Sequence, residues 1–202
     1  QNIGTTNAVI NLLKPEPDKI VQPEKINTIN DLICHPEGIT NIKTLETIPH
    51  SPEYYFTKMT AVAPAFSDKP DELASIKFLK NLCSQSPDVF SRLITVLSTA
   101  ITGRGPSIQK FPVFTGSAGS GKSQLLILLH SILGDYSIMC KPETFYQSMN
   151  GGDVPRSDLL DLVGRLLAVI PEPDHNARIS TTLIKMLPGG DPLRHRRQHS
   201  KQ

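Results

Sequence analysis

Two stretches in the middle of the chain carry apolar residues at the spacing of an α-helix. In the segment 71–83 the repeating apolar positions are Leu73, Ile76, Leu79 and Leu82. In the segment 87–101 they are Val89, Leu93, Val96, Leu97 and Ala100. Such spacing places the apolar side chains on one helical face, and Ser86, Pro87 and Asp88 supply a cap and first turn for the second stretch. We therefore predict two amphipathic helices.

The chain before these helices shows no long helical pattern. Prolines interrupt it repeatedly, at Pro15, Pro17, Pro23, Pro36, Pro49, Pro52 and Pro64. Because proline removes a backbone donor and blocks the helix interior, we predict only short strands and loops there. A polar loop with Gly103, Gly105 and Pro106 follows the second helix and marks the entry to another unit.

Strand and helix patterns alternate after this loop. The run Phe111 to Phe114 is prone to form a strand, and a helix begins near Lys122 and ends at Gly134 and Asp135. Two further β-prone runs follow at 136–139 and 166–170. This order predicts an α/β fold with a parallel sheet. We divide the chain into a mixed strand and loop lead-in (1–69), a helical linker (70–104) and an α/β core (105–202).

The loop between the first predicted strand and its helix carries a phosphate-binding pattern. It reads Gly116, Ser117, Ala118, Gly119, Ser120, Gly121, Lys122 and Ser123, which fits the Walker A sequence G-x-x-x-x-G-K-[ST]. Glycines let successive backbone N–H groups turn toward phosphate oxygens, and the new helix adds its positive end. We expect Lys122 to reach the β- and γ-phosphates and Ser123 to ligate Mg²⁺. The predicted cofactors are therefore ATP and Mg²⁺.

A P-loop enzyme also needs an acid at the end of a neighbouring strand, to hold Mg²⁺ or the attacking water. Glu172 follows the apolar run 166–170 after Pro171, and we take it as the catalytic and metal-binding candidate. The alternative is a surface carboxylate in a proline-bounded turn.

Composition adds few constraints. The chain has 202 residues, 38% of them hydrophobic, and a net charge of +2, which suits a soluble globular fragment. Its longest apolar runs fall far below the ~20 residues of a membrane-spanning helix, so we expect no membrane contact. Cys34, Cys83 and Cys140 are widely spaced, which favours a reducing, intracellular compartment over a disulfide or zinc framework.

The order of motifs downstream resembles the superfamily III helicases of phage and large-DNA-virus primase-helicases, including poxvirus-type NTPases. Residues 165–174 read RLLAVIPEPD and residues 185–196 read KMLPGGDPLRHR, similar to the R-L-hydrophobic-x-E-P and K-x-L-T-G-G-D-P segments of that family. The resemblance is good from about Gly105 to Arg196. Upstream, residues 7–12 and 50–58 agree more loosely.

This resemblance implies an AAA+-like P-loop NTPase core that forms a homo-hexamer and moves on single-stranded DNA, coupled to a primase at a viral or phage replication site. It also implies a DNA-facing role for Lys185, Asp191 and Arg194, although Lys185 reads equally well as a solvent-facing helix residue. Pro171 and Pro188 depart from the family pattern. We expect the family's sensor asparagine and arginine finger to lie beyond Gln202.

Two other functions remain open. Another P-loop enzyme such as a nucleotide kinase would show an arginine-rich lid after the third strand. A truncated, non-catalytic module that binds nucleotide or DNA is the second. The cations at the C-terminal end, Arg194, Arg196, Arg197 and Lys201, suit contact with phosphates or a solvated tail.

Overall fold

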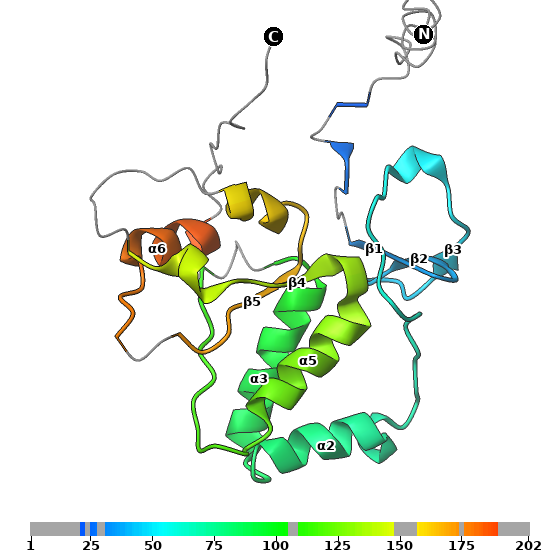
Figure 1. Ribbon diagram of the computed structural model, residues 1–202. Coiled ribbons are helices and arrows are strands. Elements are labelled where there is room, and N and C mark those ends of the chain that lie inside the picture. The colour runs from blue at the N-terminus through cyan, green and yellow to red at the C-terminus, as the bar shows by residue number, and fades with distance from the viewer. Residues whose placement is uncertain are drawn as a thin grey trace, which may run out of the picture.

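A three-stranded antiparallel sheet and a two-stranded parallel sheet form the framework of the protein. The computed structural model describes residues 21–22, 25–27, 31–104, 109–147, 157–173 and 176–189 (Figure 1). The antiparallel sheet contains β1 (Leu32–His35), β2 (Gly38–Asn41) and β3 (Thr47–Ile48) in that order. The short strands expected in this part of the chain are therefore present.

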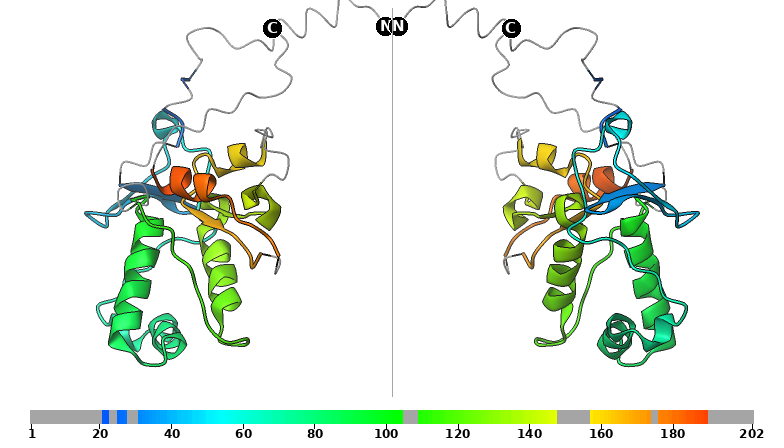
Figure 2. Two further views of the ribbon diagram at one scale, coloured as in Figure 1. Left: turned by 90° about the vertical axis from the view of Figure 1, so that its left-hand side faces the viewer. Right: turned by 90° about the vertical axis from the view of Figure 1, so that its right-hand side faces the viewer.

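Three helices pack together below this sheet. They are α2 (Ala74–Leu82), α3 (Pro87–Ile101) and α5 (Lys122–Leu133). Cys83, Leu93 and Leu125 form the buried centre of their contact. In the side views of Figure 2, α3 and α5 run as separate columns and α2 lies at the lower end of α3. The glycine-rich loop 116–121 enters α5 at this lower end.

The helix predictions are confirmed, with one shifted boundary. The structure places α3 at the predicted residues, and α5 ends at Leu133 with Gly134 after it. The first helix begins at Ala74, three residues later than predicted, because Pro70–Glu72 forms a 3-10 turn and Leu73 is extended. Proline at the start of that turn fixes a different entry to the helix.

A second core joins the antiparallel sheet to the end of α5. Its buried members are Ile33 of β1, Leu133 of α5 and Tyr136. From here β4 (Ser137–Met139) runs parallel to β5 (Leu167–Val169), with Ser137 opposite Leu167. The two later strands expected from the sequence are thus present and parallel, each shorter than predicted. The last described helix is α6 (Thr181–Gly189), so Lys185 lies on a helix, as one of its two readings expected.

The expected strand Phe111 to Phe114 is absent, which corrects the sequence prediction. These residues are described, and they form no strand. Among the described residues, β4 pairs only with β5, and the segment joins neither strand, so its backbone groups lack the ladder that a strand needs. Val113 is accordingly 72% exposed, while Phe114 packs against the core of the three helices.

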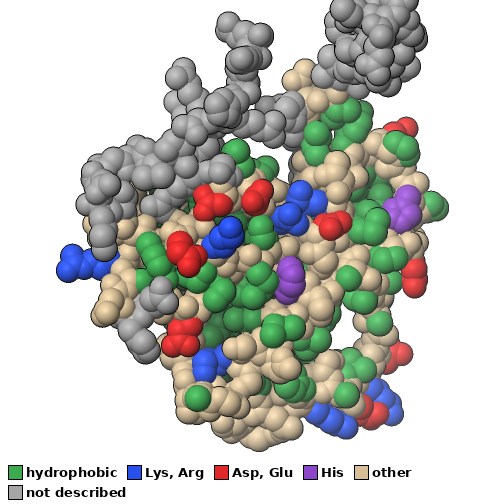
Figure 3. All heavy atoms as spheres, viewed as in Figure 1, with side chains coloured by type: hydrophobic (Ala, Val, Ile, Leu, Met, Phe, Trp, Pro, Cys, Tyr) green, Lys and Arg blue, Asp and Glu red, His purple; other side chains and the backbone are tan. Residues whose placement is uncertain are grey.

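Apolar side chains also gather on the surface in the middle of the face shown in Figure 3, over α5 and the parallel strands. The exposed large side chains of α5 and β4 are Ile127, Leu128, Ile132 and Met139. Because Leu125 and Leu133 of the same helix are buried, α5 is apolar on its inner and outer sides. Among the described helices, none is long and apolar enough to cross a membrane.

Candidate nucleotide site

The glycine-rich loop turns directly into α5 at Gly121. This residue is the N-cap of the helix, with φ 86° and ψ 2°, a left-handed conformation that favours glycine. Its carbonyl accepts the first helical hydrogen bond from Leu125, at 3.0 Å. A Cβ on Gly121 would lie 2.7 Å from Leu82 Cδ1. The left-handed turn therefore favours glycine here, whereas the Leu82 side chain could shift to make room for a methyl group.

Lys122, the first residue of α5, folds its side chain back onto the loop. Its Nζ donates to the carbonyl oxygen of Gly116 at 2.9 Å and to that of Ser117 at 2.8 Å. A third bond goes to Ser120 Oγ at 3.0 Å. An ammonium group has three hydrogens to donate, so these acceptors can use all of them. The loop thus holds one cation at its centre.

The start of α5 has the donor chemistry of an anion site. A hollow of about 300 Å³ is lined by the continuous segment 119–124, with Lys122 and Ser123 on it. The N–H groups of a first helical turn have no partners inside the helix, and they form its positive end. The exposed Ser123 hydroxyl is free to point at a metal. These groups suit a magnesium-bound polyphosphate.

Glu172 lies in the exposed loop that follows β5, as the sequence predicted. Among the described residues, no hydrogen bond or ion pair connects it to Lys122 or Ser123. Within the same ranges, no group of three His, Cys, Asp or Glu side chains could hold a metal ion. The described residues therefore place no preassembled carboxylate cluster beside the glycine-rich loop.

The residues expected to face DNA are only partly described. Lys185 is exposed on α6, whereas Asp191 and Arg194 lie outside the described residues. An isolated antiparallel bridge between Tyr146 and Ile179 holds the segment that leads into α6. Figures 1 and 2 place α6 toward the upper end of the molecule and the beginning of α5 at the lower end. The structure therefore does not bring Lys185 to the glycine-rich loop.

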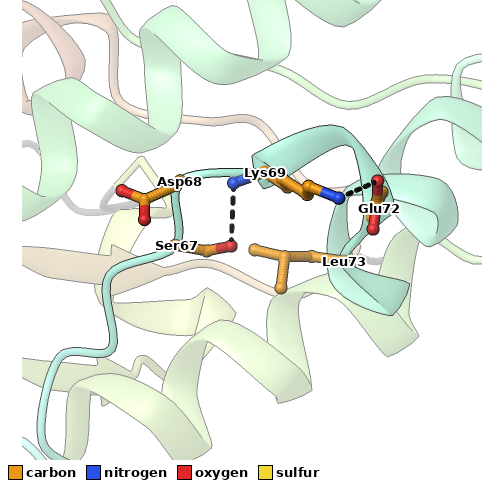
Figure 4. Close-up of a pocket in the computed structure, with 5 residues that line it drawn as sticks. All are labelled: Ser67, Asp68, Lys69, Glu72 and Leu73. Atoms are coloured by element: carbon orange, nitrogen blue, oxygen red, sulfur yellow. Dashed lines mark hydrogen bonds and ion pairs between the residues drawn. The ribbon is translucent and has the colours of Figure 1, made fainter.

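A second hollow, of about 380 Å³, lies before α2 (Figure 4). Its lining residues are Ser67, Asp68, Lys69, Glu72 and Leu73. The Lys69 ammonium pairs with Glu72 at 3.4 Å, and the Lys69 N–H donates to Ser67 Oγ at 3.1 Å. Because its cation is already paired and two carboxylates line it, this hollow has no evident anion chemistry. Nothing in the local sequence pattern pointed to it.

Sequence reasoning also missed a buried polar cluster in the antiparallel sheet. His35 Nε2 lies 2.8 Å from Thr40 Oγ1, which lies 2.7 Å from Thr47 Oγ1. The preceding residue, Cys34, contacts His50: its Sγ lies 3.7 Å from His50 Nδ1. Burial raises the pKa of the Cys34 thiol. The adjacent pair Cys34 and His35 was visible in the sequence, but their partners come from other strands and loops.

Comparison with known proteins gives two matches. Residues 1–93 match a family described as D5 N terminal like. A protein of Acanthamoeba polyphaga mimivirus, whose name provisionally calls it a helicase, is 31% identical over 118 residues. That alignment covers 57% of this chain and 12% of the mimivirus protein, so the chain spans a small part of that relative. Both findings fit a D5-type primase-helicase family.

Proposed function

We propose that the protein binds ATP with Mg²⁺ at Gly116–Ser123 and is the nucleotide-binding part of a replicative DNA helicase. The observation that carries the proposal is Lys122 at the first position of α5, with its ammonium in the centre of a glycine-rich loop. The helicase name of the mimivirus relative and the D5-type family match support the choice of a helicase over other P-loop enzymes.

The residues present fit a magnesium nucleotide. The loop and the first turn of α5 offer N–H groups to phosphate oxygens, and Lys122 supplies a cation for the β- and γ-phosphates. Ser123 is placed one residue later, where its hydroxyl can complete the coordination of Mg²⁺. The magnesium nucleotide supplies the phosphoryl group whose hydrolysis powers a motor, while these side chains bind and orient it.

The fold that we propose for this site is an AAA+-like P-loop NTPase core, preceded by the mixed sheet and the helical segment. The parallel pairing of β4 and β5 and their contact with α5 support it. In such a core, an acid after the second strand of this pair orients water or metal. We assign this role to Glu172, which follows β5.

The same proposal includes single-stranded DNA as the partner and a homo-hexamer as the working state, with a primase in the same polypeptide. Lys185, Asp191 and Arg194 would face the DNA. A cation on an exposed helix can follow a phosphate backbone without reading bases, which suits Lys185 on α6.

Titration calorimetry with ATP and Mg²⁺ tests the nucleotide site. Lys122→Ala should weaken binding strongly, because it removes the cation that meets the phosphates. Lys141→Ala removes an exposed lysine elsewhere and should leave the affinity unchanged. Glu172→Gln should still bind ATP, because the cradle of backbone N–H groups and Lys122 stays intact. Equal affinity in wild type and Lys122→Ala would refute the assignment.

A further inference from the structure

An aromatic loop stands out above the antiparallel sheet, at the far end of the molecule from the glycine-rich loop (cyan in Figure 1). It follows β3 and turns through the 3-10 helix Pro52–Tyr54. Three aromatic residues come in succession here: Tyr54, Tyr55 and Phe56. Tyr54 is 36% exposed and Tyr55 is 40% exposed. The nucleotide site uses none of these side chains.

Asn27 fixes the base of this loop. Its side chain makes two hydrogen bonds to Thr57: Oδ1 accepts the Thr57 N–H at 2.7 Å, and Nδ2 donates to Thr57 Oγ1 at 2.6 Å. Its backbone N–H donates to the Tyr55 carbonyl at 3.2 Å. Tyr55 has a φ of 50°, which is uncommon for a bulky residue. These contacts hold the aromatic side chains on a preset turn, so a ligand does not have to order the loop.

The aromatic rings of the loop leave stacking surface open. Tyr54 and Phe56 stack on each other, with ring centroids 6.3 Å apart and an angle of 26° between the ring planes. Phe56 thereby supports the Tyr54 ring from one side, while Tyr54 and Tyr55 stay in contact with water. Every nucleobase has a π face that can stack on such a ring, and the bases of a single strand are free to do so.

The charges around the loop are nearly balanced. Lys58 follows the loop, and its Cε lies 3.4 Å from the Cβ position of Gly164, the neighbour of Arg165. Within the described ranges, no ion pair joins Lys58 or Arg165 to a carboxylate. Glu53 on the loop and Asp135, whose carboxylate accepts the Met59 N–H, oppose these two cations. Charge alone therefore attracts phosphates weakly, and stacking has to supply most of the binding free energy.

We propose that Tyr54 and Tyr55 form a platform on which the bases of single-stranded DNA stack, with Lys58 and Arg165 beside it for the phosphates. The choice of DNA over RNA rests on the proposed helicase function, whereas the stacking does not. Figure 1 places this platform on the opposite side of the molecule from α6, so it is a contact separate from Lys185. Because all bases stack, binding should vary little with sequence.

Fluorescence anisotropy tests the platform with the full chain and two labelled strands, an oligothymidylate and an abasic strand with the same number of phosphates. Both strands carry the same charges, and only the first carries bases. Wild type should bind the oligothymidylate about fivefold more tightly or better, the lower end of the range for one stacked base. Changing both residues, Tyr54→Leu with Tyr55→Leu, should remove this preference and leave the abasic affinity unchanged. Equal wild-type affinity for the two strands would overturn the platform.

Two matched variants separate stacking from other effects. Tyr54→Phe with Tyr55→Phe keeps both rings, so the preference for the strand with bases should survive. Its loss in this variant would overturn stacking as the cause. Phe66→Leu removes a ring that is 57% exposed outside the loop and should leave the preference at the wild-type value. Circular dichroism spectra like that of wild type would show that the leucine variant is folded.

The salt dependence gives an independent readout. The leucine variant should bind the oligothymidylate more weakly at every salt concentration, with an unchanged slope of log affinity against log salt. Lys58→Gln should instead make that slope shallower by about 0.7. A slope that changes as much in the leucine variant as in Lys58→Gln would overturn the stacking role.

Two further measurements keep this inference distinct from the proposed function. Titration calorimetry should give the leucine variant the ATP affinity of wild type, so equal binding of the two strands would remove the platform and leave the nucleotide site standing. Failure of wild type to bind ATP would remove the nucleotide site and leave the platform standing. Tighter binding of an oligouridylate than of the oligothymidylate would overturn the choice of DNA.

Discussion

The phenol oxygen of Tyr136 lies 3.4 Å from the backbone nitrogen of Cys34, a contact between residues 102 apart in the sequence. The Cys34 N–H donates, and the buried tyrosine hydroxyl accepts. The ring of Tyr136 packs with Ile33 and Leu133 in the same place. This contact ties β1 to the end of α5, and thereby the antiparallel sheet to the helix that follows the glycine-rich loop.

Replacing Tyr136 by phenylalanine should destabilise the protein by about 1 kcal/mol, within the usual range for one buried hydrogen bond. The ring keeps its packing, and the loss comes from a Cys34 N–H left without this acceptor. Urea unfolding followed by circular dichroism measures the change. Tyr55→Phe, at a tyrosine that is 40% exposed, should stay close to wild type. Equal unfolding midpoints for wild type and Tyr136→Phe would show that the contact contributes nothing.

A second link crosses the same boundary at Gly134. The segment 59–61 runs between β1 and the end of α5: the Thr60 N–H donates to the Cys34 carbonyl at 2.9 Å, and the Ala61 N–H donates to the Ile132 carbonyl at 3.0 Å. Gly134 has φ 51° and ψ −123°. A Cβ there would lie 2.7 Å from the nitrogen of Ala61 and 3.0 Å from the Met59 carbonyl oxygen.

We expect Gly134→Ala to lower the free energy of unfolding by at least about 2 kcal/mol, since a positive φ alone costs a non-glycine residue ~1–2 kcal/mol and the new methyl meets backbone atoms. Gly119→Ala is the matched comparison. Gly119 also has a positive φ, of 76°, but nothing lies within 4 Å of its Cβ position. The decrease in the free energy of unfolding of Gly119→Ala should reflect the backbone strain alone. Thermal melting measures both variants. A lower melting temperature for Gly119→Ala than for Gly134→Ala would contradict this account.

The stability of the antiparallel sheet should depend on pH through His35. This side chain is 1% exposed, and its Nδ1 accepts the N–H of Glu37 at 3.3 Å. The proton of the neutral ring therefore sits on Nε2 and is directed at Thr40 Oγ1. Burial lowers the pKa of His35 from its ordinary value of 6.5, Glu37 opposes this shift and His50 adds to it.

Because the pKa is lowered by folding, His35 is protonated at a higher pH in the unfolded chain than in the folded chain. The contribution of neutral His35 is fully present above pH 6.5 and is lost as pH falls through the folded-state pKa. Urea unfolding between about pH 7.5 and pH 5 should show falling stability in wild type and a smaller slope in His35→Gln. Nuclear magnetic resonance of the His35 ring gives the titration directly. A ring that titrates at or above 6.5 would contradict the prediction.

Local patterns predicted the helices well and the sheets incompletely. Ser86, Pro87 and the apolar spacing that follows define α3, because a helix start and its buried face are both local properties. The run Phe111 to Phe114 has equally strong local propensity, yet it forms no strand, because a strand depends on a distant segment for its hydrogen bonds. The contact of Tyr136 with Cys34 is likewise invisible to any local pattern.

The candidate site was likewise predicted only in part. The glycine and lysine spacing predicted the loop, its helix and the place of Lys122, since all of these follow from eight consecutive residues. The pattern does not specify, however, that Lys122 bonds Gly116, Ser117 and Ser120 of its own loop. The position of Glu172 relative to the loop depends on how β5 packs, which sequence spacing does not specify.

The proposed DNA contact makes a prediction about salt. Lys185 is exposed on α6, and Arg194, Arg196 and Arg197 follow it in the sequence. Cations that neutralise phosphates release condensed counterions, so log affinity for a single strand falls with log salt by ~0.7 per phosphate. Three or four contacts predict a slope of about −2 to −3. There should be little base preference, because no aromatic residue lies among these cations to stack on bases.

Fluorescence anisotropy with labelled oligonucleotides at several salt concentrations measures this slope. Lys185→Ala should make it shallower by about 0.7, and replacing the three arginines together should reduce it by about 2. Lys141→Ala removes one positive charge from an exposed lysine outside α6 and should leave both affinity and slope near wild type. If Lys141→Ala changed the slope as much as Lys185→Ala does, only the net charge would matter. Affinity that does not vary with salt would remove the DNA-facing role from Lys185 and the arginines.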